Sequence, residues 1–265
     1  MWTQQRNMSN KSNKSSKSSE GEEKKMDDEP PIALNLGCGK NILPSEQGWI
    51  NVDGMKNDGV DVVFDLDDCR TSPLPFDDDS VSVVLLSHVM EHLHHTLPLM
   101  DEVYRVCKSD AKIIIRTPHG ASDDAWEDPT HLRGYFPSSF EYFSQPMYWR
   151  ADYGYKGDFK SEVVNLYIEN KVLLDDTNEE IIRKVMHERN WVSEMEAVLT
   201  CIKPARKADK QLRSAPRLQI LKRGTDLNPE GQNGIGAQGK QMKEVRKDSN
   251  DSNDSNDKDN VELVD

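Results

Sequence analysis

A short apolar run that ends in Gly-x-Gly constrains the fold of this chain more than any other feature. Residues 34–41 read LNLGCGKN, in which Gly37 and Gly39 follow the apolar residues directly. Because glycine has no Cβ, these two positions can turn with positive φ and let a ligand approach the backbone closely. The pattern predicts a first β-strand that turns tightly beneath a nucleotide-like ligand.

An acidic residue ends the next apolar run, WINVD at residues 49–53. The carboxylate of Asp53 can accept hydrogen bonds from both hydroxyl groups of an adenosine ribose. Position 42 is Ile42, so the third glycine of the dinucleotide pattern G-x-G-x-x-G is missing. A nicotinamide-dependent oxidoreductase is therefore kept only as a minor alternative.

Both ends of the 265-residue chain are too polar to form a core. Residues 1–28 are rich in Ser, Asn, Lys and Glu, and residues 224–265 repeat Asp-Ser-Asn, so we predict disordered tails at both ends, the second one acidic. The foldable domain then spans residues 29–203. A basic linker or helix is predicted at residues 204–223.

Net charge limits the partners that the chain can bind. The formal net charge of −13 argues against tight general binding of nucleic acid, because phosphate neutralisation needs a surplus of Lys and Arg. One local exception is the basic segment 203–223, which could make weak contact with RNA or an acidic partner. A solvated linker is the simpler interpretation of this segment.

The cysteines and the hydropathy favour a cytoplasmic protein. Four cysteines are present, and no two of them form a C-x-x-C pair, which fits neither a disulfide framework nor a zinc-binding cluster. No apolar run approaches the roughly 18 residues that span a bilayer. We expect a reducing compartment and no membrane partner.

Short apolar runs alternate with turns and helical patterns, which is typical of a mostly parallel α/β sheet. The first five runs are rich in Val, Ile and Leu, as expected of strands that are covered on both faces. Helices are predicted at residues 96–108, with Thr96 as the N-cap, and at residues 178–189. The seven predicted strands span residues 32–36, 49–52, 60–64, 81–86, 111–116, 163–168 and 194–201.

Taken in order, these features resemble the class I S-adenosylmethionine-dependent methyltransferases over about residues 31–203. The most specific block leads from LPFD at residues 74–77 to VVLLSHVMEHL at residues 83–93, which is similar to the fourth-strand region of these enzymes. The segment 102–108, EVYRVCK, is similar to the helix that follows it. The other blocks are residues 34–39, 51–53 and 63–66.

The resemblance implies a Rossmann-like fold of three layers, with a seven-stranded sheet whose last strand is antiparallel. S-adenosyl-L-methionine would lie over the carboxyl ends of the first strands, which is where open α/β sheets bind ligands. The glycine-rich turn would meet the methionine part, Asp53 the ribose, and Asp65 with Leu66 the adenine. The implied cofactor-binding residues are Asn35, Gly37, Cys38, Gly39, Asp53, Asp65, Leu66 and His88.

Two details depart from the family pattern. Only about twelve residues separate the first two strands and about six separate the next two, whereas parallel crossovers normally need a dozen or more residues. The flanking helices there must be short or missing. In addition, Ser109-Asp110 replaces the Gly-Gly that commonly precedes the fifth strand.

The residues after the fifth strand are the candidates for catalysis and substrate binding, because loops at strand carboxyl ends carry function. His131 is the first choice for a general base, with Asp128 to orient it. Arg133 could hold an anionic substrate. His119 and Tyr135 are further candidates for substrate binding. A histidine that only hydrogen-bonds its loop is an equally strong interpretation of His131.

Residues 88–92, HVMEH, also match the inverted zincin pattern H-x-x-E-H. In that pattern two helical histidines bind zinc and the glutamate activates water. Here the segment follows a predicted strand directly, and Pro98 breaks the helix. A zinc hydrolase is therefore disfavoured, and no metal is expected.

The methyl acceptor is expected to be an oxygen or nitrogen nucleophile on a small molecule or sugar. The aromatic segment 135–155 could form a substrate wall or the core of an inserted subdomain, and the second interpretation is preferred. No D-P-P-Y-like tetrad follows the fourth strand, which disfavours methylation of DNA bases. A protein or RNA acceptor is a second choice, and a non-catalytic cofactor-binding scaffold or sensor is the alternative of another class.

Overall fold

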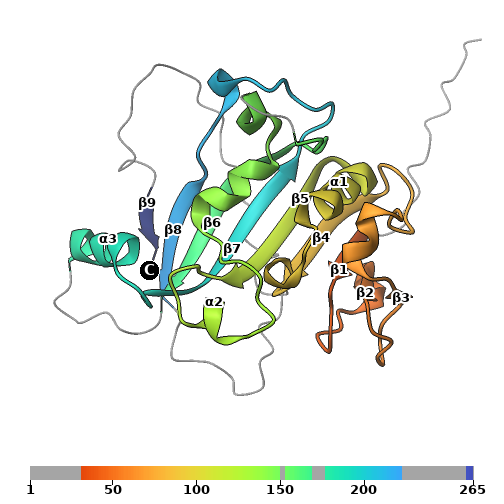
Figure 1. Cartoon of the computed structure of the whole chain (residues 1–265), viewed down its shortest axis with the longest axis horizontal. Helices are drawn as coiled ribbons and strands as arrows, with labels where there is room; N and C mark the ends of the chain where they lie inside the picture. Colours follow the sequence, from red (N-terminus) through yellow and green to blue (C-terminus); the bar gives the residue numbers. More distant parts are fainter. Residues whose placement is uncertain (1–30, 150–152, 169–176, 223–260, 265) are drawn as a thin grey trace, which may run out of the picture.

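The computed structural model describes residues 31–149, 153–168, 177–222 and 261–264, and its described strands form one nine-stranded sheet (Figure 1). The strand order is β3-β2-β1-β4-β5-β7-β6-β8-β9. The strands are β1 (Ile32–Leu36), β2 (Trp49–Asp53), β3 (Val62–Val63), β4 (Val81–Ser87), β5 (Cys107–Pro118), β6 (Phe159–Ile168), β7 (Val192–Cys201), β8 (Arg217–Lys222) and β9 (Val261–Val264). All seven predicted strands are present.

The directions of the strands confirm the expected topology. Strands β1 to β5 all run parallel to one another. Strand β7 is antiparallel to both β5 and β6, as the resemblance implies for the last strand of the seven. Ligands bind such sheets beyond the carboxyl ends of the parallel strands, so the edge that carries Leu36, Asp53 and Ser87 is the one to inspect.

Strands β8 and β9 were not expected. The basic segment 204–223, predicted as a linker or helix, contains β8, which pairs in parallel with β6. Four residues of the predicted acidic tail form β9, which pairs in parallel with β8. Both segments alternate or concentrate apolar residues, as in RLQILK and VELV, and that short pattern was hidden within polar surroundings.

The longer helices lie close to where the sequence predicts them. Helix α1 spans Thr96–Val106 and α3 spans Asn178–His187, with a short α2 at Asp124–Glu127. Thr96 is the first residue of α1 rather than its N-cap, which is His95. No helix among the described residues has the length and apolar character needed to cross a membrane.

The connections around β2 are short, as expected. A single 3-10 turn, η1 (Ser45–Gln47), lies between β1 and β2. In place of helices, a buried amide pair holds this region, because the Asn35 Nδ2 donates to the Asn51 Oδ1 at 3.0 Å. The Asn51 side chain in turn accepts from the backbone N–H of Leu43 and donates to its carbonyl, both at 2.9 Å.

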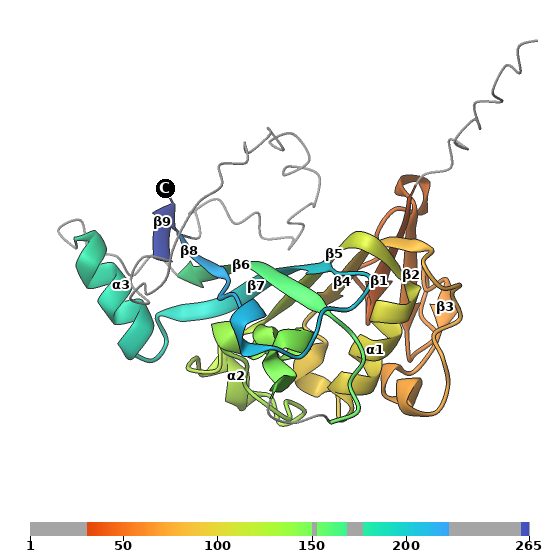
Figure 2. The same ribbon diagram turned by 90° about the horizontal axis from the view of Figure 1, so that it is seen from above.

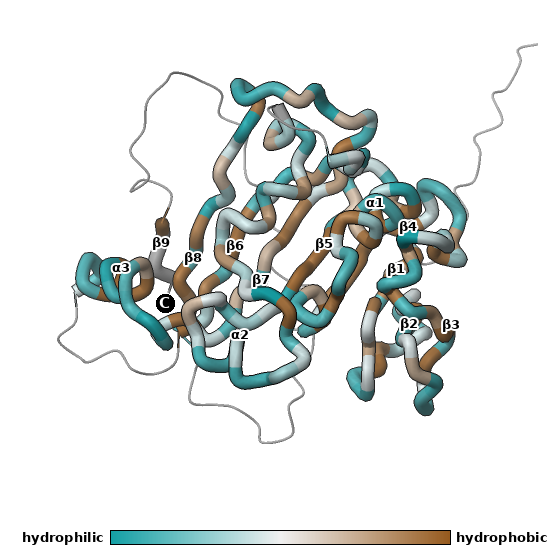
Figure 3. The backbone as a smooth tube through the Cα atoms, viewed as in Figure 1, coloured by the Kyte–Doolittle hydropathy of each residue, from teal (hydrophilic) through white to brown (hydrophobic). Residues whose placement is uncertain are grey.

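Helices α1 and α2 cover one face of the sheet, whereas α3 lies beside its far end (Figure 2). In Figure 2, α1, α2 and the neighbouring 3-10 turns lie on the same side of the strands. The core forms there, where alternate strand residues such as Ile113 and Ile115 are fully buried, and the apolar residues are concentrated along the central strands (Figure 3). The described part therefore has two layers where three were expected.

The opposite face of the central strands carries polar pairs. The Arg116 Nε donates to the Glu196 carboxylate at 2.8 Å, and the Lys112 Nζ to the Thr200 Oγ1 at 2.6 Å, each from β5 to β7. Asn165 on β6 adds a hydrogen bond of 3.1 Å to Glu196. These pairs explain why the apolar runs of β5 and β7 are interrupted by charged residues.

Asp110 explains one departure from the family pattern. Its φ of 65° lies in the left-handed region, where the family commonly has glycine. Aspartate tolerates this region better than most residues, because its short side chain can hydrogen-bond locally. The replacement of Gly-Gly by Ser109-Asp110 therefore keeps a residue with left-handed φ near the start of β5.

Candidate functional site

The glycine-rich turn after β1 has the backbone geometry that the sequence predicts. Gly37 has φ 67° and Gly39 has φ 53°. A Cβ at Gly37 would lie 2.5 Å from the Cγ2 of Val89, so the turn packs closely against the segment after β4. A Cβ at Gly39 would meet no atom within 4 Å, which leaves open space for a ligand above the turn.

Asp53 closes this turn from the end of β2. Its Oδ2 accepts a hydrogen bond of 2.8 Å from the Gly39 N–H, and its Oδ1 accepts one of 2.9 Å from the Met55 N–H. Each carboxylate oxygen has a second lone pair with which to accept from a ribose hydroxyl. The open space at Gly39 and the half-buried Asp53 together fit an adenosine-containing cofactor.

The other predicted cofactor residues differ in their exposure. Burial and the nearby Asp53 raise the pKa of the Cys38 thiol to about 11, so Cys38 is a packed residue rather than a reactive thiol. Asp65 is exposed and accepts from the Asp67 N–H at 3.0 Å, as the N-cap of the 3-10 turn η2 (Leu66–Arg70). Leu66 is buried, and Asn35 belongs to the amide network beneath the turn.

His88 lies directly after β4, at the mouth of that strand as expected. Its φ is 55°, an uncommon value for a residue other than glycine and one that often marks a functional site. The His88 Nε2 lies 2.7 Å from the Glu194 Oε1 on β7. This hydrogen bond, with help from Glu91, raises the pKa of His88 to about 9, so the imidazole is protonated at neutral pH.

A cavity of about 430 Å³ adjoins His88. It lies at the carboxyl ends of β4 and β5 and at the start of the antiparallel β7, next to the edge that carries the glycine-rich turn. Ligand cavities of this size are common in enzymes. The lining residues are His88, Pro118, Asp124, Glu127, Asp128, His131, Ser193 and Glu194.

The lining of this cavity, which we name the acceptor cavity, is acidic. It contains four carboxylates and no Lys or Arg, so even a protonated His88 leaves it negative. Hydrogen bonds from the side chain and backbone of Thr130 lower the pKa of Asp128, which keeps that carboxylate ionised. The cavity therefore favours a cationic ligand.

His131, the predicted general base, lines the cavity, but its partners differ from those expected. Its Nδ1 lies 3.1 Å from the Ala125 carbonyl, to which it donates. The Asp128 Oδ2 lies 3.8 Å from the Nε2, which is beyond hydrogen-bond distance. The ring instead contacts the His92 ring edge-on, with centroids 4.7 Å apart. The backbone carbonyl, rather than Asp128, orients this histidine.

The three predicted substrate residues support the loop instead of lining the cavity. Arg133 donates to the carbonyls of Leu93 and His94, at 2.9 and 3.2 Å, so its guanidinium is occupied by backbone. Tyr135 is buried and donates to the Met90 carbonyl at 3.2 Å. His119 is also buried, which lowers its pKa to about 4.

The aromatic segment mainly forms core, which was the preferred interpretation. Phe140 and Phe143 are buried in the 3-10 turn η4 (Pro137–Phe143), and Tyr155 is buried behind them. Tyr142 and Tyr153 are exposed.

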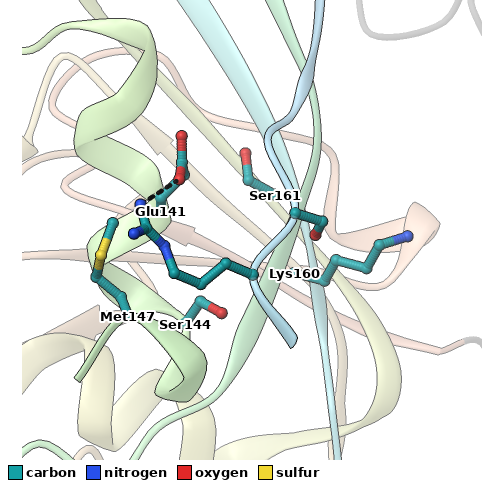
Figure 4. A pocket seen from close by; sticks show the side chains of 7 residues that line it. Glu141, Ser144, Met147, Lys160 and Ser161 are labelled. Atoms are coloured by element: carbon teal, nitrogen blue, oxygen red, sulfur yellow. Dashed lines mark ion pairs between the residues drawn. The ribbon is translucent and has the colours of Figure 1, made fainter. Parts of the chain in front are cut away.

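A second cavity, between η4 and β6, is too small for a substrate (Figure 4). Its volume is about 10 Å³, about enough for one water molecule. Arg213 and Glu141 form an ion pair of 3.8 Å across it.

The basic segment uses several of its charges within the fold. Arg206 donates to both carboxylate oxygens of the fully buried Asp158, at 2.9 and 2.8 Å. Lys203 pairs with Asp79 at 2.5 Å. These contacts indicate that the basic segment is anchored within the fold instead of extending from it to bind RNA. Contact with an acidic partner stays a prediction.

Sequence reasoning missed Asp124, Glu127 and Glu194 as cavity residues. Glu194 lies 106 positions from His88, and no local motif connects the two. Asp124 and Glu127 belong to the four-residue α2, which is too short to give a helical pattern. The only signal was the acidic run DDAWED at residues 123–128.

Comparison with solved structures gives similarities of fold below 25% identity. A SAM-dependent methyltransferase from Archaeoglobus fulgidus is 22% identical, with a TM-score of 0.46, over 64% of this chain and 86% of its own. The complex of the Haloferax volcanii Trm112 methyltransferase activator with a methyltransferase gives 16%, a TM-score of 0.42, and coverages of 66% and 84%. At these TM-scores, neither similarity bears on the substrate or partner of this chain.

Comparison of the sequence is more informative about the family. The comparison with curated proteins found no match. The methyltransferase domain family matches residues 47–115, a stretch that contains Asp53, His88 and α1. Over this stretch the chain is similar to the methyltransferase domain family, and S-adenosyl-L-methionine is the cofactor that this similarity implies.

Proposed function

We propose that this methyltransferase acts on a nitrogen nucleophile of a small cationic molecule. The observation that carries the proposal is the acceptor cavity, whose lining holds four carboxylates and no basic residue other than two histidines. The sequence alone left oxygen and nitrogen acceptors open and favoured a small molecule or sugar. The charge of the cavity favours an amine.

The cofactor would be held by the turn at Gly37 and Gly39 and by Asp53, whose geometry fits an adenosine. Bound S-adenosylmethionine supplies an electrophilic methyl group on a sulfonium sulfur. The chain contributes mainly position, because in-line displacement needs the two reactants aligned and close. The adjacency of β1 and β4 in the sheet sets the cofactor edge beside the cavity.

The charge of the lining suits transfer to nitrogen. An amine that accepts a methyl group gains a positive charge, whereas a deprotonated oxygen loses its negative one. Carboxylates that are already in place stabilise a cation as it develops, without reorganisation during the reaction. Asp124 and Glu127, both exposed at the cavity, are suited to attract a cationic amine from solution.

An ammonium group must lose a proton before it can attack. Glu194 is our candidate to receive it, because this partly buried carboxylate lies in the cavity beside His88. His131 is less suited than the sequence suggested, because its side chain is only 8% exposed. The role of His88 is then to hold Glu194 in place through the 2.7 Å contact.

The test is a transfer assay with methyl-labelled cofactor and paired acceptors that differ only in an amine or a hydroxyl group. We expect turnover with amines. The variant Asp124→Asn/Glu127→Gln should raise KM for cationic amines about tenfold and leave the affinity for S-adenosylhomocysteine unchanged. The control Asp58→Asn/Glu179→Gln removes two exposed carboxylates outside the cavity. Preference for alcohols, or equal effects of the two double variants, would reject the proposal.

A further inference from the structure

Three potential metal ligands meet beside the acceptor cavity, and the mechanism above uses none of them. They are Glu91 and His92, in the 3-10 turn η3 (Met90–His92), and His131 in the loop after α2. One ligand atom from each lies within 4.8 Å of the other two. We infer that Glu91, His92 and His131 bind one Zn²⁺ ion.

The hydrogen bond of His131 prepares it as a ligand. A carbonyl can only accept, so the His131 Nδ1 must carry the proton that it donates to the Ala125 oxygen at 3.1 Å. In the neutral ring, the Nε2 then holds a free lone pair. Metal-ligating histidines commonly donate their other ring N–H to a backbone carbonyl in this way.

His92 is oriented in a similar way, through a hydrogen bond to Thr130 that is itself held by Asp128. The Thr130 Oγ1 lies 2.7 Å from the Asp128 Oδ1 and 2.9 Å from the His92 Nδ1. An ionised carboxylate only accepts, so the single hydroxyl proton of Thr130 goes to Asp128. Thr130 must therefore accept from His92, which leaves the His92 Nε2 with a free lone pair. A carboxylate thus orients this histidine through one hydroxyl group.

Glu91 supplies the negative charge. It is 1% exposed, and neither of its carboxylate oxygens has a hydrogen-bond partner. Its near neighbour is the His88 Nδ1, 3.4 Å from the Oε1, which is close enough for an ion pair but lacks hydrogen-bond geometry. A buried carboxylate without donors is costly. A cation between Glu91 and the two histidines would satisfy it.

The donor set identifies the class of metal. Two imidazoles and one carboxylate are typical of zinc sites with three protein ligands and an open fourth position. Ligand atoms around one tetrahedral zinc lie about 3.3 Å apart, so the ligand atoms, now within 4.8 Å of one another, would approach by up to about 1.5 Å on binding. The Leu132 N–H, which donates to the Glu91 carbonyl at 2.8 Å, already joins the two segments.

This ligand set differs from that of the inverted zincin pattern. That pattern needs His88 and His92 on one helix, but η3 is a three-residue turn and His88 has left-handed φ. His88 is directed to Glu194 instead. The ligand that replaces it, His131, is distant in sequence and lies outside the H-x-x-E-H pattern. A zinc ion here would fix the loop that lines the acceptor cavity.

The test is a zinc titration of the full chain, after removal of metal, in competition with a chromophoric chelator. We expect one equivalent to bind, and a Co²⁺-loaded sample to give the visible absorption of a four-coordinate site. His131→Ala should weaken zinc binding by more than about a hundredfold, since even outer partners cost about 10- to 100-fold. Thr130→Val, at an exposed position, should cost about 10- to 100-fold by releasing His92. Circular dichroism confirms that each variant is folded.

The matched controls are His94→Ala and His95→Ala, in the same histidine-rich run but outside the ligand set. Both should leave zinc affinity unchanged. Absence of zinc binding, a loss with these controls as large as with His131→Ala, or no effect of Thr130→Val would overturn the inference. The titration contains neither cofactor nor amine, so its failure would leave the proposed acceptor class untouched.

Discussion

The cofactor end of the sheet edge, at Gly37 and Gly39, and its acceptor end, at His88 and Glu194, are formed by different kinds of contact. At the cofactor end, the contacts that shape the turn join residues close in sequence, such as Gly39 with Asp53, 14 positions apart. At the acceptor end, His88 meets Glu194 across 106 positions. The first end can therefore be recognised from one stretch of sequence, whereas the second needs the whole fold. The family match, at residues 47–115, includes Asp53 and His88 but neither the turn at Gly37 and Gly39 nor Glu194.

The largest effect is expected at the opposite edge of the sheet from the acceptor cavity, where a buried ion pair joins Asp158, directly before β6, to Arg206, which follows β7. Arg206→Met leaves the fully buried Asp158 carboxylate without its cationic partner. Breaking a buried pair in this way costs about 3–5 kcal/mol of unfolding free energy. Chemical denaturation measures it, with the exposed neighbour Lys207→Met as control. A loss equal to that of the control would mean that the stability of the fold does not depend on this ion pair.

The next largest effect distinguishes Gly37, which is needed for close packing, from Gly39, which leaves space for the cofactor. Gly37→Ala adds a Cβ 2.5 Å from Val89 at a φ of 67°, so we expect a loss of roughly 2–3 kcal/mol in stability. Gly39 also has positive φ, but a Cβ there would meet open space. Gly39→Ala should therefore lower the stability less than Gly37→Ala does and weaken cofactor binding more. Thermal unfolding and calorimetric titration with S-adenosylhomocysteine measure the two effects. The reverse ranking would contradict the assignment of the open space to the cofactor.

Asp53→Ala tests whether the two ends act independently. It removes charge-assisted hydrogen bonds worth roughly 1.5–3 kcal/mol, so the affinity for S-adenosylhomocysteine should fall about tenfold or more. The KM for the amine should stay near the wild-type value, because Asp53 is outside the acceptor cavity. Asp58→Ala is the exposed control. Unchanged cofactor affinity would reject the ribose assignment.

The smallest effect concerns pH. Burial lowers the pKa of His119 to about 4 from an ordinary 6.5, so the unfolded chain binds a proton more readily between these values. The contribution of neutral His119 is complete above about pH 6.5 and is lost as pH falls toward 4. Between pH 7 and pH 5 we expect a loss of about 1–2 kcal/mol. His119→Leu should flatten this part of the profile, unlike the exposed control His187→Leu.

The sequence was sufficient for the parts of the fold that depend on local pattern. All seven predicted strands, both longer helices and the turn at Gly37 and Gly39 are in the structure. The missing third layer was partly foreseeable, because the connections around β2 are too short for helices. Strands β8 and β9 were not, because a four- to six-residue strand within polar sequence gives too few alternations to detect.

The candidate site was predictable only in its backbone part. Arg133 and Tyr135 were predicted to bind substrate from their chemistry, but the chemistry of a residue does not show where its side chain points. The structure uses both to hold the loop that carries His131. The acceptor carboxylates and the meeting of Glu91 with His131 arise from tertiary contacts between distant segments, which no spacing rule reports.

The polar pairs on the side of β5 and β7 that faces away from α1 and α2 have a consequence for how the protein behaves at high concentration. Arg116 and Glu196 lie on the same face as the apolar Val83 and Ile114. Glu196 is buried, whereas the Arg116 side chain is 28% exposed, so its charge keeps the accessible part of this face hydrated and disfavours the stacking of two sheets. These polar pairs therefore oppose self-association. A variant in which leucine replaces both Arg116 and Glu196 should precipitate before it unfolds.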